Sequence, residues 1–88
     1  MDLVPEFLMR RREDIASIES GVRAGTFSDI RRMGHIMKGA GGAYGFDAIS
    51  EIGAAIELAA KQSDSPAVTA LAARLGSYLD RLEVVPDS

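Results

Sequence analysis

The chain has 88 residues and a formal net charge of −3, which leaves room for one domain with one modest core and argues against nucleic-acid binding. It contains no cysteine, so disulfides and cysteine-based zinc sites are excluded. No apolar run reaches the roughly 18 residues of a membrane span, and Asp2 stands where a signal peptide would have basic residues. We therefore expect a single cytoplasmic domain over residues 1–88, too small for an ordinary enzyme that builds its own substrate cleft.

The first predicted helix covers residues 5–24. Pro5 suits an early helical position, and Gly25 is a typical residue at which a helix ends. The apolar positions recur at helical spacing, interrupted by Arg11: Val4, Leu8, Ile15, Ile18 and Val22. Residues 10–12 are arginines, which we interpret as a solvated helix face.

The second predicted helix covers residues 27–44. Thr26 and Asp29 have the spacing of a capping box at its start. Apolar side chains recur at steps of three and four along one face: Ile30, Met33, Met37, Ala40 and Tyr44.

The third and fourth predicted helices cover residues 47–62 and 66–82. Asp47 is a good N-cap for the third helix, and Ser65 is the expected N-cap of the fourth, with Pro66 at its first position. The apolar stripe of the third helix is Ile49, Ile52, Ile56 and Ala59 or Ala60. That of the fourth is Val68, Leu71, Leu75, Leu79 and Leu82.

Amphipathic helices with short connections predict an all-α fold, an antiparallel up-and-down four-helix bundle. No strand pattern and no internal repeat stands out, and the tail at 83–88 is expected to fray. We expect a monomer in which these residues point inward: Ile30, Met37, Tyr44, Ile52, Ile56, Leu71, Leu75 and Leu79.

The second helix is unusual in its glycine content, with Gly34, Gly39, Gly41, Gly42 and Gly45 close together. Each glycine inside a helix costs about 0.8–1 kcal/mol relative to alanine. Such a cost indicates either that the segment is not helical or that something requires the missing side chains.

The face of this helix opposite the apolar stripe carries the only histidine. At about 100° per residue, that face holds Ser28, Arg31, Arg32, His35, Lys38, Gly39 and Gly42. An exposed imidazole can act as a nucleophile near neutral pH, and the phosphorylated form carries about two negative charges, which Lys38 can reach from the next turn. Gly39 and Gly42 would leave clearance for a partner. The alternative is an ordinary surface histidine, with Gly34, Gly41 and Gly45 allowing close helix packing.

The string His35-Ile36-Met37-Lys38-Gly39, with Gly45 six residues later, resembles the H-x-x-K-G…G signature of histidine phosphotransfer (HPt) domains, particularly bacterial members. The four predicted helices also match the layout of that family over nearly the whole chain. The resemblance implies that His35 is phosphorylated, through Nε2, that Lys38 assists the phosphoryl group, and that Gly39 permits docking of a response-regulator receiver.

One departure from the family pattern concerns the residues after Gly39. Family members often have a small polar residue there, but Ala40, Gly41 and Gly42 supply no such side chain. Any hydrogen bond to the imidazole therefore has to come from elsewhere. The remaining residues of the expected docking face are Gly42, Arg31, Arg32 and Ser28.

The expected function is that of a phosphorelay carrier, not an enzyme with its own ATP site. His35 would exchange a phosphoryl group with the aspartate of a receiver, which supplies Mg²⁺, while this chain has no cofactor or metal of its own. A hybrid sensor kinase is the further partner considered. Two alternatives stay open: a non-catalytic helical interaction module, and the phosphoacceptor helices of a histidine kinase, in which an acid commonly follows the histidine where Ile36 stands here.

Overall fold

The computed structural model describes residues 4–83, and within them it contains four α-helices and no strand. They are α1 (Val4–Ala24), α2 (Phe27–Ala43), α3 (Asp47–Lys61) and α4 (Ser65–Glu83). Each end lies at the predicted residue or at its neighbour. Residues 84–88 of the predicted tail, and the side chains of Val4 and Glu83, lie outside the described part of the chain.

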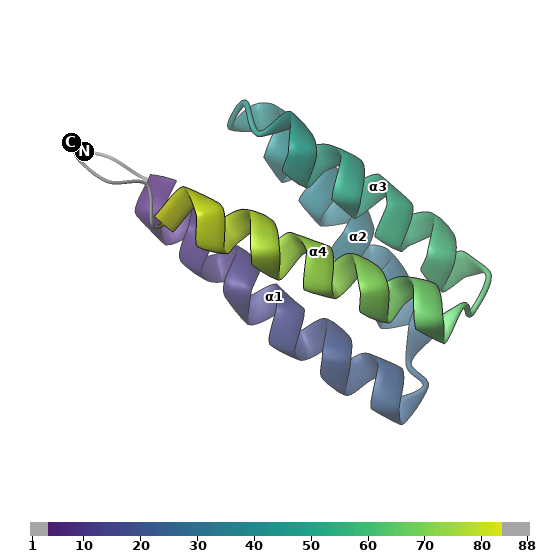
Figure 1. The fold of residues 1–88 in the computed structure, drawn as a ribbon. Coiled ribbons are helices and arrows are strands. Elements are labelled where there is room, and N and C mark those ends of the chain that lie inside the picture. Colours follow the sequence, from purple (N-terminus) through teal and green to yellow (C-terminus); the bar gives the residue numbers. More distant parts are fainter. Residues whose placement is uncertain (1–3, 84–88) are drawn as a thin grey trace.

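The helices form the predicted antiparallel bundle. In Figure 1, α1 runs beside α4 and α2 runs beside α3, and α4 also contacts α3. The contact between α2 and α3 is the most extensive in the molecule. The packing of α2 on α3 determines the rotation of α2 about its axis. It therefore determines the direction in which the His35 side chain points.

The core contains apolar side chains from all four helices: Phe7, Ile18, Ile30, Met37, Ile49, Ile52, Ile56, Ala59, Ala60, Val68, Ala72, Leu75 and Leu79. Six of the eight residues predicted to point inward are among them. Leu71 is only partly buried at the edge of the core. The prediction for Tyr44 was wrong, because α2 ends at Ala43 and leaves the Tyr44 side chain 44% exposed.

An aromatic stack closes the end of the bundle where α2 turns into α3. The Phe7 ring lies 4.3 Å from the Tyr44 ring and 5.6 Å from the Phe46 ring, centroid to centroid. Phe7, which the predicted stripe of α1 omitted, is thus the buried residue that ties α1 to this turn. Tyr44 covers it from outside, so the ring of Tyr44 is in contact with protein although much of it faces solvent.

Arg11 does not belong to a solvated face, as predicted for residues 10–12, because it is buried. Its guanidinium lies 4.8 Å from the Phe7 ring centroid, a cation–π contact, and its Nε lies 2.8 Å from Asp14 Oδ2. Burial raises the pKa of Asp14 above its usual range, and the neighbouring Arg11 charge opposes that rise. Arg12 reaches across to Asp80 on α4 at 2.7 Å, which leaves Arg10 as the most exposed of the three.

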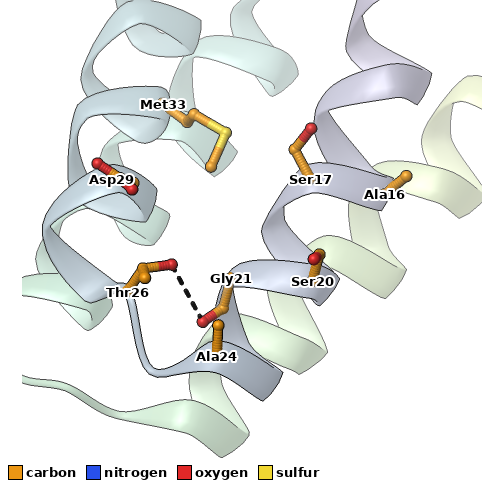
Figure 2. Close-up of a pocket in the computed structure, with 8 residues that line it drawn as sticks. All are labelled: Ala16, Ser17, Ser20, Gly21, Ala24, Thr26, Asp29 and Met33. Carbon is orange, nitrogen blue, oxygen red and sulfur yellow. Dashed lines mark hydrogen bonds between the residues drawn. The ribbon is translucent and has the colours of Figure 1, made fainter.

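The start of α2 differs from the predicted capping box. The Thr26 side chain makes no cap hydrogen bond to α2 and instead donates from Oγ1 to the Gly21 carbonyl of α1 at 3.4 Å (Figure 2). The Thr26 N–H also donates to Gly21 O, at 2.9 Å. Gly25 between the helices has φ +76°, a conformation that glycine adopts without steric cost. The Thr26 side chain therefore closes α1, while the Thr26 carbonyl accepts from Asp29 and Ile30 at the N-cap position of α2.

The predicted N-caps of α3 and α4 are also shifted by one residue. Phe46 occupies the cap position of α3, so Asp47 is the first helical residue, where its charge favours the helix dipole. At α4 the cap is Asp64, whose Oδ1 accepts a hydrogen bond from the Ala67 N–H at 3.1 Å. Ser65 is therefore already helical. Asp64 and Ser65 are adjacent and both are good capping residues, so the sequence alone does not show which of them is the N-cap.

Candidate functional site

His35 lies on the outward face of α2, as its position opposite the apolar stripe predicted. Its side chain is 70% exposed. Nδ1 of the ring lies 3.2 Å from Oε2 of Glu57, a residue of α3 that is 22 positions away in the chain. Nε2 is the second ring nitrogen, and it takes no part in the Glu57 contact.

Glu57 supplies the hydrogen bond that Ala40, Gly41 and Gly42 could not. A carboxylate can only accept, so Nδ1 carries the hydrogen and donates to Glu57 Oε2. In the neutral imidazole, this tautomer leaves the lone pair on Nε2. Sequence reasoning missed Glu57 because nothing local marks it: it lies beside Ile56 in a helix, and only the antiparallel pairing of α2 with α3 brings it to His35.

Two clefts lie near the His35–Glu57 pair and share Arg31 and Glu57 in their lining. One, of about 320 Å³, is lined by Ser28, Arg31, Arg32, His35 and Glu57. The other, of about 230 Å³, is lined by Arg31, Lys38, Ala54, Glu57, Leu58 and Lys61. The structure thus brings together the predicted cations of α2 on one side of the bundle. It adds Lys61, a cation of α3 one turn after Glu57 that sequence reasoning did not assign to the site.

The glycines of α2 fall into two groups. A Cβ added at Gly39 would meet no atom within 4 Å, and one at Gly42 would meet only Ser50 Oγ at 3.9 Å, so both are open to solvent as predicted. At Gly34 and Gly41 an added Cβ would lie 2.6 Å from backbone nitrogens of α3, so these two residues permit close helix packing. Gly45 belongs to neither group, because its φ of +81° explains it as a turn residue.

Exposed apolar side chains accompany the hydrogen-bonded pair. Ile36, which follows His35, is 55% exposed, and Leu58, which follows Glu57, is 58% exposed. Large apolar residues at an exposed position are common when they occur singly. Leu58 lines one of the two clefts, and Ile36 lines neither.

A further cleft lies elsewhere, between α1 and the first half of α2. It measures about 430 Å³ and is lined by Ala16, Ser17, Ser20, Gly21, Ala24, Thr26, Asp29 and Met33. Figure 2 shows Ser17 and Met33 facing each other across it. Neither a histidine nor a cation lines this cleft, so its chemistry does not resemble that of the His35 face.

The described helices also bear on membrane and metal binding. No helix within residues 4–83 is long and apolar enough to cross a membrane. In the same part of the chain, no group of three or more His, Cys, Asp or Glu side chains could hold a metal ion.

The described residues thus form a helical bundle that presents an exposed, hydrogen-bonded histidine beside cationic side chains. The family model of the Hpt domain matches residues 2–84, and the chain belongs to the Hpt domain family. Members of this family act in histidine phosphotransfer in phosphorelay signalling. They are phosphocarriers that interact with receivers and kinases. No curated protein and no solved structure matches the chain.

Proposed function

We propose that His35 is the phosphorylated residue of this Hpt domain and that it exchanges a phosphoryl group with the aspartate of a response-regulator receiver. The hydrogen bond between His35 Nδ1 and Glu57 Oε2 is the observation that carries the proposal. It holds the ring in one orientation and leaves Nε2 as the nucleophile. The 70% exposure of the side chain makes that nitrogen accessible to a second protein.

The transfer step balances without an added base. The Nε2 lone pair forms the N–P bond to the receiver's aspartyl phosphate, the P–O bond to the aspartate breaks, and the aspartate leaves as a carboxylate. The imidazole becomes more positive as the bond forms, and the Glu57 carboxylate stabilises the Nδ1–H. In the reverse direction, the receiver aspartate attacks the phosphohistidine. The Mg²⁺ that this chemistry uses is expected on the receiver, with none bound by this chain.

The surface around His35 suits a doubly negative group. Arg31 and Arg32 line one cleft, and Lys38 lines the other. Phosphoryl transfer depends mostly on positioning and charge stabilisation, and these cations supply the second of these. Ser28, Gly39 and Gly42 complete the proposed docking face with small side chains or none. We propose a cytoplasmic, monomeric phosphocarrier without an ATP site.

Lys38→Ala should slow transfer severalfold and shorten the lifetime of the phosphohistidine, with little effect on folding. Lys38 is exposed, and exposed charge pairs contribute about 0.2–1 kcal/mol, so a partial effect is expected. Rapid-quench transfer rates and the hydrolysis half-life of the phosphorylated domain measure it. Arg74→Ala, an exposed cation of α4, is the matched control. If Lys38→Ala has the wild-type transfer rate and the wild-type hydrolysis half-life, Lys38 is not part of the site.

Glu57→Gln should slow transfer about tenfold while the melting temperature stays close to that of the wild type. The amide still accepts from Nδ1, but a neutral acceptor is about half as strong as a charged one, and about 1.4 kcal/mol corresponds to a factor of ten in rate. The measurement is the single-turnover rate from a phosphorylated receiver. Glu51→Gln, an exposed acid on the same helix, should transfer normally. Equal rates in both variants would contradict the role given to Glu57.

The proposal as a whole is tested by incubating the purified chain with a panel of receivers that carry a radiolabelled phosphoryl group. We expect an acid-labile, base-stable label on the chain with at least one receiver. The proposal would be contradicted if the chain bound receivers but took up no label from phosphorylated receivers or phosphorylated kinases. That result would favour the non-catalytic interaction module.

A further inference from the structure

The two helices that carry His35 and Glu57 touch through their backbones directly beneath these side chains. Gly34 precedes His35, and a Cβ added at Gly34 would lie 2.6 Å from the nitrogen and 3.0 Å from the Cα of Glu57. Side chains do not approach backbone atoms that closely, so only glycine allows α3 to lie at its observed distance. The residue before the histidine therefore sets the position of the residue that holds the ring.

Gly53 makes the reciprocal contact from α3. A Cβ added there would lie 2.6 Å from the Lys38 nitrogen and 2.8 Å from the Gly34 carbonyl oxygen. Both Gly34 and Gly53 are buried. The turn of α2 from Gly34 to Lys38 is thus pressed against the turn of α3 from Gly53 to Glu57, and Ser50 Oγ adds a hydrogen bond to the Lys38 carbonyl at 2.9 Å.

The reach of the Glu57 side chain makes this spacing matter. Its Oε2 lies 3.2 Å from His35 Nδ1, near the upper limit of a hydrogen bond between nitrogen and oxygen. A further separation of the helices would increase the distance that the Glu57 side chain has to span to reach His35 Nδ1. Neither glycine touches the proposed phosphoryl position, so any effect on transfer has to act through Glu57 and Lys38.

On the basis of the function proposed above, we propose that Gly34 and Gly53 are positioning residues: their backbone contact sets the distance at which Glu57 holds the His35 imidazole in its Nδ1–H form. This role is distinct from that of Gly39 and Gly42, which are open to solvent. It is also distinct from that of Gly41, whose added Cβ would lie 2.6 Å from the Ser50 nitrogen, two turns further along the same interface.

The test compares Gly34→Ala and Gly53→Ala with two controls. Gly41→Ala introduces an equally close contact at the same interface but away from Glu57. Gly76→Ala changes a glycine of α4 whose added Cβ would meet Ile15 Cδ1 at an ordinary 3.7 Å. In each variant, nitrogen NMR of ¹⁵N-labelled histidine at alkaline pH reports the fraction of neutral ring protonated on Nδ1, circular dichroism reports folding, and single-turnover kinetics report transfer.

We expect Gly34→Ala and Gly53→Ala to lose the Nδ1–H preference and to transfer at least about ten times more slowly than the wild type. Gly41→Ala should lower the melting temperature by the same amount but keep the wild-type tautomer. A folded Gly34→Ala variant with the wild-type tautomer would overturn the proposal. So would equal loss in Gly41→Ala, which would indicate a general packing effect.

If the alanine variants do not fold, Glu57→Asp decides, since it withdraws the carboxylate by one methylene without touching the backbone contact. Loss of the Nδ1–H form in that variant supports the proposal, and its retention overturns it. The tautomer measurement needs no receiver. It therefore judges the role of the glycines even if the wild-type chain accepts no phosphoryl group, an outcome that would contradict the proposed function alone.

Discussion

His35→Gln is expected to abolish phosphoryl acceptance from receivers while the helical bundle stays folded. The chain has a single histidine, so no second imidazole can take its place. The side chain is 70% exposed, and it forms a surface hydrogen bond to Glu57. Removing such a contact should change the free energy of unfolding by no more than about 1 kcal/mol.

The measurement pairs acid-labile labelling by a phosphorylated receiver with thermal unfolding followed by circular dichroism. Gln62→Ala, an exposed change just after α3, provides the control for handling and folding. Acid-labile label at the wild-type level in His35→Gln would remove His35 from the proposed role. A collapse of the helical signal would instead show that the histidine supports the fold.

Gly39→Gln is expected to block transfer while the domain melts at the same temperature as the wild type or higher. An added Cβ at Gly39 meets no atom within 4 Å, and glutamine favours the helical state over glycine by up to about 1 kcal/mol. The same side chain would occupy the surface one turn from His35, where a receiver aspartate has to come within bonding distance of the phosphorylated ring. We expect a loss of at least about a hundredfold in transfer rate.

The control for Gly39→Gln is Gly39→Ala, which adds the helix-favouring change with little bulk. It should raise the melting temperature by a few degrees and reduce transfer far less than Gly39→Gln. Receiver binding by calorimetry should weaken in parallel with transfer. If Gly39→Gln transfers at the wild-type rate, the receiver docks on another surface, even if His35 is the phosphorylated residue.

The helices and the outward histidine could be predicted because they depend on periodicity. Apolar residues at steps of three and four fixed which face of α2 turns inward, and His35 lay on the other. Cap positions were less certain, since Asp64 and Ser65 are both good caps and a hydrogen bond at 3.1 Å decides for Asp64. The exposure of Tyr44 followed from where α2 ends, a matter of one residue that periodicity does not determine.

The two parts of the site that sequence could not supply both depend on the pairing of α2 with α3. Glu57 is 22 positions from His35, and its approach follows from the register of two antiparallel helices. The glycines of α2 divide as the sequence indicated, because Gly34 and Gly41 face α3 whereas Gly39 and Gly42 face solvent. The role of Gly53 could not be predicted either, because it depends on the contact of α3 with the backbone of Lys38 on α2.

The central claim is that Nε2 of His35 carries the phosphoryl group, and one measurement tests it most directly. The chain, labelled with ¹⁵N-histidine, is phosphorylated by its receiver and examined by NMR for coupling between phosphorus and nitrogen. We expect the coupling to appear at Nε2 of His35, with Nδ1 still protonated beside Glu57. Coupling at Nδ1, or phosphate found on a residue other than His35, would contradict it.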